Sequence, residues 1–357
     1  MRAPPNPLKC LLVLVVAGCT SHDPASPVPP GDDTGGAAGA SGSATPAGST
    51  SSHDGGEGGG SGAERSAAGA PTAAGAAGDA PLLACGEVEA PRAWPDWVMP
   101  NPVASGLPHP ASYAVNESGE QVTDEVTGLV WQRRVPPQSF GWQDAKSYCS
   151  CLNLDGDDDW RLPSRIELAS LVDWTKVGPS IDSDAFPETT SENFWTSSEV
   201  GIDPGLIYLV FFLNGHTTYA ASDYEYRVRC VRSAVAPGTE RYAIEAGVVK
   251  DAFTQLSWQQ QTPSDHYGFS EAGQYCAGLT LDGGGWRLPS INELQTLVDE
   301  TKNPSINLTA FPGTPSEYFW SSSPVIDDAS RAWTTFFTNG STYSFAASSG
   351  KNVRCVR

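Results

Sequence analysis

The sequence has few basic residues: 21 Lys and Arg stand against 41 Asp and Glu, which gives its 357 residues a formal net charge of -20. Binding to nucleic acid requires clustered Lys and Arg that neutralise phosphates. Adsorption to anionic lipid surfaces requires the same kind of charge. The composition therefore argues against nucleic acid as a partner and against a membrane contact made through anionic lipids.

Histidine is also scarce, with five residues in the whole chain. Two of them, His22 and His53, lie in a segment made almost entirely of Gly, Ala, Ser, Thr and Pro. Around the other three, which are His109, His216 and His266, no Ser–His–Asp or Cys–His combination recurs in both halves of the remaining chain. We therefore expect no catalytic residues and no enzyme activity.

The apolar run at residues 11–17 is too short to span a bilayer. It follows Arg2 and Lys9 and leads into Val-Ala-Gly-Cys at 16–19, the pattern that lipoprotein signal peptidase cuts. We expect residues 1–19 to be a signal peptide that ends at a lipidated Cys19, which anchors the protein in the outer membrane. The anchored protein would lie on the periplasmic face or on the cell surface. A secretory signal without lipidation is the alternative.

Residues 20–84 contain too few apolar side chains to offset the entropy of ordering, so we expect a disordered tether. A flexible chain of about 65 residues averages roughly 40–50 Å from end to end. The tether would therefore separate the lipid anchor from the folded part of the protein.

The rest of the chain contains one sequence twice, at an offset of 125 to 129 positions. The segment "AKSYCSCLNLDGDDDWRLPSRIELASLVD" matches "AGQYCAGLTLDGGGWRLPSINELQTLVD", and both halves end in "VRCVR". Two copies with so long a period indicate a tandem domain duplication and not a solenoid. We therefore expect an N-terminal extension at 85–112, copy 1 at 113–232, a linker at 233–240 and copy 2 at 241–357.

The patterns predict an α+β fold in each copy, with two helices followed by an antiparallel sheet. In the first helix, Ala145, Tyr148, Cys149 and Leu152 follow the i, i+3, i+4, i+7 spacing of a buried helical stripe. The second helix begins with an S-x-x-E capping box, at Ser164 in copy 1 and Ser290 in copy 2. Asn-Gly pairs at 214–215 and 339–340 stand between apolar runs and predict two-residue hairpin turns.

Beyond the signal peptide six cysteines remain, and an even number in an exported chain indicates disulfides. Cys149 and Cys230 stand at the same positions of the repeat as Cys276 and Cys355, so we predict a Cys149–Cys230 and a Cys276–Cys355 bond. Each would close a loop of about 80 residues, worth roughly 4 kcal/mol. The remaining pair, Cys85 and Cys151, would fasten the extension to copy 1. The Cys149-x-Cys151 spacing is a poor match to a zinc site, which is the alternative.

The order of motifs resembles a known bacterial family. Each copy carries a strand ending in Trp, then A-x-x-Y-C, W-R-L-P-S-x-x-E-L, F-W-(S/T)-S-S, a hairpin and R-C-V-R. This series is similar to the domain named after the C-terminal domain of the collagen-like adhesin Lcl. The resemblance implies a C-type-lectin-like fold and a role in surface attachment, through binding of sulfated glycosaminoglycans in the adhesin. Acidic residues outnumber basic ones in both copies, which opposes binding of a polyanion here.

Arginine and tryptophan next to the capping boxes are expected to serve the structure. We predict that Arg161 and Arg287 pair with Glu167 and Glu293, or with carbonyls at the helix entrance, and that the shared tryptophans belong to the core. The tryptophans are Trp160, Trp195, Trp286 and Trp320.

A ligand-binding site is predicted at the hairpins, where polar side chains alternate with aromatic ones that could hold a sugar. The residues are Asn214, His216 and Tyr219 in copy 1, and Asn339, Ser341 and Tyr343 in copy 2. The Glu-Pro-Asn or Gln-Pro-Asp triplet of calcium-dependent lectins is absent.

The acidic run "LDGDDDWRLPS" is a second candidate site, in which Asp155, Asp157 and Asp159 could hold calcium. Copy 2 has "LDGGGWRLPS" instead, and Trp160 stands where an EF-hand requires Gly. A looser calcium site in copy 1 alone stays a hypothesis; otherwise no cofactor is expected.

Together these features predict a non-catalytic envelope lipoprotein whose paired domains bind a glycan or a surface protein. The alternatives are a structural lipoprotein that contacts other envelope proteins and, more remotely, an enzyme with a fold like that of formylglycine-generating enzymes.

Overall fold

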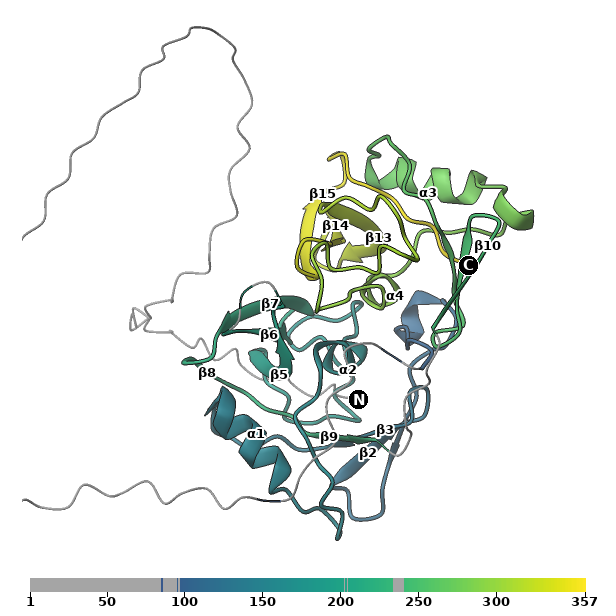
Figure 1. Cartoon of the computed structure of the whole chain (residues 1–357). Helices are drawn as coiled ribbons and strands as arrows, with labels where there is room; N and C mark the ends of the chain where they lie inside the picture. Colours follow the sequence, from purple (N-terminus) through teal and green to yellow (C-terminus); the bar gives the residue numbers. More distant parts are fainter. Residues whose placement is uncertain (1–84, 86–94, 96, 202, 204, 234–240) are drawn as a thin grey trace, which may run out of the picture. The chain divides into compact units, whose positions relative to one another are not determined.

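The computed structural model describes residues 85, 95, 97–201, 203, 205–233 and 241–357 (Figure 1). The signal peptide, Cys19, the tether and most of the linker fall outside the described residues, so these predictions are not addressed by it. Within the described ranges, no helix combines the length and the apolar character that crossing a membrane requires.

Copy 1 follows a short 3-10 helix, η1, at Val103–Ser105, and contains two helices and three small antiparallel sheets. The helices are α1 (Trp142–Ser150) and α2 (Arg165–Ser170). The first sheet has the order β1-β2-β3-β9, with bounds Tyr113–Val115, Gln121–Asp124, Leu129–Gln132 and Val231–Ser233. The other two are β4-β8 and β5-β6-β7, with bounds Phe140–Gly141, Glu225–Tyr226, Asn193–Glu199, Leu206–Phe211 and His216–Ala221.

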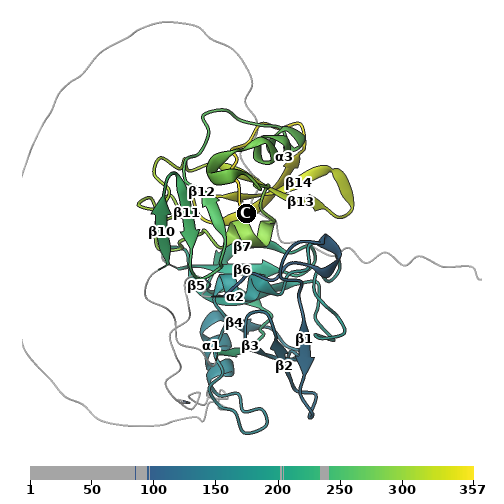
Figure 2. The ribbon, with the colours of Figure 1, turned by 90° about the vertical axis from the view of Figure 1, so that its right-hand side faces the viewer.

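Copy 2 repeats the order of helices and main sheets, with isolated bridges Tyr267↔Lys351 and Trp258↔Val356 in place of the β4-β8 and β3-β9 pairs. The α+β class and the tandem organisation are therefore confirmed. Its helices are α3 (Phe269–Gly278), the 3-10 helix η2 (Leu281–Gly283) and α4 (Ile291–Gln295). One sheet, visible in Figure 2, has the order β10-β11-β12, with bounds Tyr242–Glu245, Val248–Asp251 and Ser257–Gln259. The other has the order β13-β14-β15, with bounds Tyr318–Val325, Asp328–Phe336 and Ser341–Ala346.

The predicted capping boxes begin α2 and α4. The Ser164 hydroxyl accepts from the Glu167 backbone N–H, and the Glu167 carboxylate accepts from the Ser164 N–H at 2.8 Å. Arg161 then donates twice to the same carboxylate, over 2.7 Å each. Ser290, Glu293 and Arg287 repeat this set in copy 2. The arginines beside the caps therefore hold the helix entrance, as the sequence predicted.

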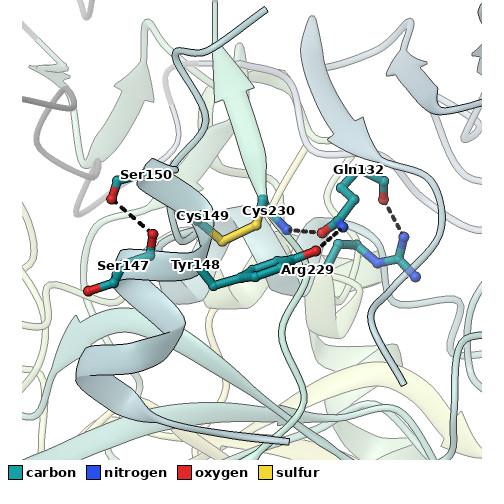
Figure 3. Close-up of a disulfide and its surroundings, with 7 residues drawn as sticks. All are labelled: Gln132, Ser147, Tyr148, Cys149, Ser150, Arg229 and Cys230. Atoms are coloured by element: carbon teal, nitrogen blue, oxygen red, sulfur yellow. Dashed lines mark hydrogen bonds between the residues drawn. A yellow bond between two sulfur atoms is a disulfide. The ribbon is translucent and has the colours of Figure 1, made fainter. Parts of the chain in front are cut away.

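The three predicted disulfides are present and connect the expected pairs. Cys149–Cys230 joins α1 to the segment before β9 inside the core of copy 1 (Figure 3). Gln132 fixes the local geometry, because its Oε1 accepts from the Cys230 N–H at 3.2 Å and its Nε2 donates to the Tyr148 hydroxyl at 2.8 Å. Copy 2 repeats both hydrogen bonds around Cys276–Cys355. All four tryptophans expected in the core are buried: Trp160, Trp195, Trp286 and Trp320.

The hairpin prediction is right in position and wrong in loop length. Phe211 pairs with His216, so four residues separate β6 from β7. Phe212 is buried in the core of copy 1, which draws the chain inward and widens the turn. Gly215 has a φ of 80°, and a Cβ there would collide with Val172. Glycine is thus required both by the turn and by the contact.

The two copies contact each other through equivalent elements. α2 packs against α4, and β7 packs against β15. The backbone N–H of Thr217 donates to Oγ1 of Thr342 over 2.8 Å, and these two residues hold the same position in the repeat. Contacts between equivalent positions are the mark of an isologous interface, so the chain forms an internal pseudo-dimer.

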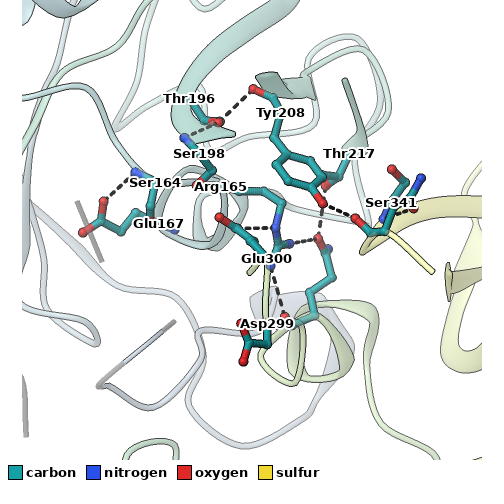
Figure 4. Close-up of polar contacts among 12 residues, drawn as sticks. Ser164, Arg165, Glu167, Thr196, Ser198, Tyr208, Thr217, Asp299, Glu300 and Ser341 are labelled. Atoms are coloured by element: carbon teal, nitrogen blue, oxygen red, sulfur yellow. Dashed lines mark hydrogen bonds and ion pairs between the residues drawn. The ribbon is translucent and has the colours of Figure 1, made fainter. Parts of the chain in front are cut away.

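The two halves of this interface use different chemistry. The fully buried Arg165 of copy 1 donates from Nε to Glu300 at 2.6 Å and from Nη1 to the Gln295 side chain at 3.0 Å (Figure 4). Ile291 stands at the position of Arg165 in copy 2, and it packs in a cluster with the counterparts of Glu300 and Gln295, which are Trp174 and Ala169. One half of the interface is therefore ionic, whereas the other combines apolar packing with uncharged hydrogen bonds that join Asn292 to Trp174 and Val172.

Candidate functional site

Four aromatic side chains form a continuous row on the sheet β13-β14-β15. Tyr318 and Phe336 are stacked with ring centroids 4.2 Å apart, and Tyr318 also contacts Phe345 at 4.7 Å and Tyr343 at 5.5 Å. Tyr318 lies opposite Phe336 across the strands, and Tyr343 and Phe345 share one face because they are two residues apart. All four rings are partly exposed. We call this set the aromatic row.

A cation lies at the end of the aromatic row. The Lys351 ammonium is 3.8 Å from the Phe345 ring centroid and 5.2 Å from that of Tyr318. Burial and the neighbouring Tyr219 and Tyr318 hydroxyls raise the pKa of Tyr343 to about 12, so this phenol stays protonated and can donate a hydrogen bond at neutral pH. The surface combines apolar ring faces with hydroxyl and ammonium donors.

Copy 1 has no such row. Asn193, Thr218 and Ala220 replace Tyr318, Tyr343 and Phe345 at the equivalent positions, and only Phe211 is retained as an aromatic residue. Because the framework is shared, the extra rings in copy 2 are not needed for the fold of the sheet. They mark copy 2 as the copy with the candidate ligand surface.

Three of the six predicted ligand-binding residues come together at this place. Tyr343 belongs to the aromatic row, and the His216 ring lies 5.6 Å from it. Tyr219 lies close enough to Tyr343 and Tyr318 to raise the pKa of both phenols. Since Tyr219 belongs to β7 of copy 1, the surface extends across the junction of the copies. The His216 ring packs beneath it, with its Nε2 buried and its ring stacked on Trp333.

The other three predicted residues serve the turns and the interface. Oδ1 of Asn214 accepts from the His216 N–H, and Oδ1 of Asn339 accepts from the Ser341 N–H, at 3.1 Å in both cases. The Asn339 carbonyl also accepts from the Tyr208 hydroxyl of copy 1. Asn339 and Ser341 are 8% and 0% exposed, so a ligand cannot reach them. Burial at the interface therefore corrects this part of the prediction.

Sequence reasoning missed Tyr318, Phe336 and Lys351. The alternation of Tyr343 and Phe345 along β15 was a usable signal, because such residues share one face of a strand. The contribution of Tyr318 depends on strand register, which cannot be read from one segment.

The acidic run of copy 1 is held by protein donors. Asp155 accepts from Ser118 at 2.6 Å and from Asn116 at 2.8 Å, and these hydrogen bonds lower its pKa. Arg232 binds Asp157 at 3.0 Å and Asp159 at 2.6 Å. Among the described residues, no group of three or more His, Cys, Asp or Glu is placed to hold a metal ion. Calcium binding itself stays a prediction.

Copy 2 shows what the loop does in both copies. Arg357, the counterpart of Arg232, donates to the Asp282 carbonyl at 2.6 Å and the Gly284 carbonyl at 3.1 Å, and it pairs with the Asp282 carboxylate. In each copy the last arginine of "RCVR" thus fastens the final segment of that copy to the loop before W-R-L-P. Three carboxylates are not required for this contact.

The architecture defines a class: a tandem pair of disulfide-bonded α+β domains, each closed by its final arginine. The family model of the Lcl C-terminal domain matches residues 120–232 and again residues 247–357. The chain therefore belongs to the Lcl C-terminal domain family, with two domains in tandem. No curated protein matches the sequence.

Proposed function

We propose that the protein is a non-catalytic envelope lipoprotein that displays a ligand-binding or adhesion surface, and that its ligand is a glycan held on the aromatic row of copy 2. The observation that carries the proposal is the set of partly exposed rings present in one copy and missing from the other. The lipobox ending at Cys19 and the long tether support display at a distance from the membrane.

Carbohydrate rings suit such a surface because their C–H faces pack on aromatic rings while their hydroxyls form hydrogen bonds at the edges. Tyr343 supplies a protonated phenol, and Lys351 supplies an ammonium. Glu317 accepts from Asn352 at 2.8 Å, and this hydrogen bond together with the nearby Lys351 lowers the pKa of its carboxyl. A neutral or acidic glycan, and not a densely sulfated one, is consistent with the single cation at the row.

The fold proposed for each copy is a variant of the C-type-lectin-like fold, as the W-R-L-P segment and the paired sheets suggest. The alternative function is a structural lipoprotein whose copies contact other envelope proteins. An enzyme of the formylglycine-generating type is less well supported, because the described cysteines outside the tether all form disulfides.

The test is a glycan-array screen with the full chain carrying Cys19→Ser, which prevents lipidation. Reproducible binding that is lost in Tyr318→Ala and kept in Tyr224→Ala supports the proposal. Tyr224 is the matched control because it is an exposed aromatic residue outside the row, with 54% exposure. Silence across the array together with co-purification of envelope proteins would favour the alternative.

A further inference from the structure

Copy 1 and the N-terminal extension form a cavity of about 330 Å³. The extension contributes Asn101 and Val103, while copy 1 contributes Tyr113, Ser170, Asp173 and Asp182. None of these residues belongs to the aromatic row. A cavity of this size is in the range of small-molecule sites.

Copy 2 fills the equivalent place with its own side chain. The Arg241 Nε donates to Oδ1 and Oδ2 of Asp251 at 3.2 and 3.1 Å, and its Nη2 donates to Oδ2 at 2.8 Å. Nη2 also donates to the Thr296 carbonyl at 2.6 Å, and the guanidinium lies 4.7 Å from the Tyr242 ring centroid. Asp251 has no exposed side-chain surface, so this arginine satisfies a buried carboxylate.

The residues that surround that guanidinium have counterparts in copy 1, and we call each set of them, a tyrosine, an aspartate and a helix-end carbonyl, the frame. Tyr113 pairs with Asp124 across β1 and β2, as Tyr242 pairs with Asp251 across β10 and β11. Asp124 also accepts from the N–H groups of Val126 and Thr127, as Asp251 does from the two corresponding residues. The counterpart of Thr296 is Ser170, which lines the cavity.

The residue that differs is the one that would fill the frame. Ser112 stands at the position of Arg241, and its hydroxyl bonds to the exposed Glu125 instead. Asp124 is 0% exposed, and burial raises the pKa of its carboxyl, as expected for a buried acid that lacks a cation. The Thr127 side chain lies close enough to this carboxyl to oppose this rise in pKa, and Oδ2 has no cation or other hydrogen-bond partner within bonding distance among the described residues.

Charge in the two frames differs accordingly. Copy 1 holds Asp124, Asp173 and Asp182 near the Tyr113 hydroxyl, with Lys176 paired to Asp173 at 3.3 Å. Copy 2 has the neutral Asn307 at the position of Asp182, and it adds Arg241 to its own lysine pair. The frame of copy 1 is therefore left with excess negative charge, whereas that of copy 2 is balanced.

We propose that the cavity of copy 1 binds a ligand through a guanidinium group that enters beside the lining residues Tyr113 and Ser170. The group reaches Asp124, which is buried outside the lining, and lies between this carboxylate and the Ser170 carbonyl as the Arg241 guanidinium does in copy 2. The Tyr113 ring would lie beside the group, and Asp182 would add an acceptor near the cavity wall. The guanidinium could belong to a small molecule or to an arginine of a peptide. This site is independent of the glycan proposal, since the two share no residue.

The experiment is isothermal titration of the full chain with Cys19→Ser against L-arginine, the tripeptide Gly-Arg-Gly and L-citrulline, the uncharged isostere of arginine. We expect arginine or the tripeptide to bind at least about 10-fold more tightly than citrulline. Only the charged guanidinium can form charge-assisted hydrogen bonds to the buried carboxylate. Preference between free arginine and the tripeptide tells which source of guanidinium the cavity accepts.

Two variants locate the site. Ser112→Arg supplies the guanidinium from the chain itself, as in copy 2, and should weaken binding at least about 10-fold while keeping or raising the urea midpoint. Asp124→Asn should weaken binding similarly, and the exposed Glu117→Gln should leave it unchanged. The proposal is overturned if neither guanidinium probe binds, if citrulline binds as well as arginine, or if Ser112→Arg binds like the parent chain.

Discussion

Removing either member of the buried pair Arg165–Glu300 should destabilise the protein much more than removing an exposed pair. The side chains are 0% and 6% exposed and lie 2.6 Å apart, so truncating one leaves the other charged in the interface between the copies. Removing one partner of a buried ion pair lowers the free energy of unfolding by about 3–5 kcal/mol. Burial already raises the pKa of Glu300 despite the neighbouring arginine, which shows how poorly this site tolerates an unpaired carboxylate.

The assay is urea unfolding, followed by tryptophan fluorescence, of Arg165→Ala, Glu300→Ala and the double variant. Arg134→Ala is the matched control because its pair with Glu188 is 47% and 61% exposed, and its loss should cost about 0–1 kcal/mol. The double variant should lose several kcal/mol less than the sum of the two single losses, since it leaves no buried charge behind. Single losses as small as that of Arg134→Ala, or strict additivity, would refute the reasoning.

Three further predictions concern pH, the disulfides and the loop. Burial lowers the pKa of His216 from 6.5 to about 4, so between these pH values the unfolded state binds one more proton than the folded state. The free energy of unfolding should therefore fall by about 3 kcal/mol from pH 6.5 to 4. Replacing His216 by Ser, the residue of copy 2, should make this fall smaller, as measured by urea titrations at a series of pH values. A Cys276→Ala, Cys355→Ala variant should lose roughly 4 kcal/mol of unfolding free energy because its bond closes a separation of 79 residues, and a loss below about 1 kcal/mol would contradict this estimate. Arg232→Ala should increase amide hydrogen exchange in the loop at 152–159 without changing the equivalent loop of copy 2, and equal exchange in both chains would count against the role assigned to Arg232.

Local signals in the sequence predicted most of the framework. The capping boxes, the helical stripe and the cysteine spacing are each determined by residues close in sequence or by comparison of the two copies. Duplication was the strongest aid, because every motif could be checked against its counterpart. This comparison also favoured a structural role for the acidic run, because copy 2 keeps the loop and lacks three of its four aspartates.

The features that could not be predicted depend on how distant segments meet. Arg165 and Ile291 occupy the same repeat position, yet one forms an ion pair and the other packs in a core, which only the contact between the copies explains. Burial of Asn339 and Ser341 has the same origin. Tyr318 enters the aromatic row through strand register, and Asp124 is left without a cation because Ser112, 12 positions earlier in the sequence, replaces an arginine.

The central claim is that the aromatic row of copy 2 binds a glycan, and one exchange between the copies tests it most directly. The double variant Tyr343→Thr, Phe345→Ala places in copy 2 the residues that copy 1 has at the equivalent positions. The dissociation constant for a glycan found on the array should rise at least about 10-fold in this variant, which should still unfold in one cooperative transition in urea. An unchanged dissociation constant would contradict the account.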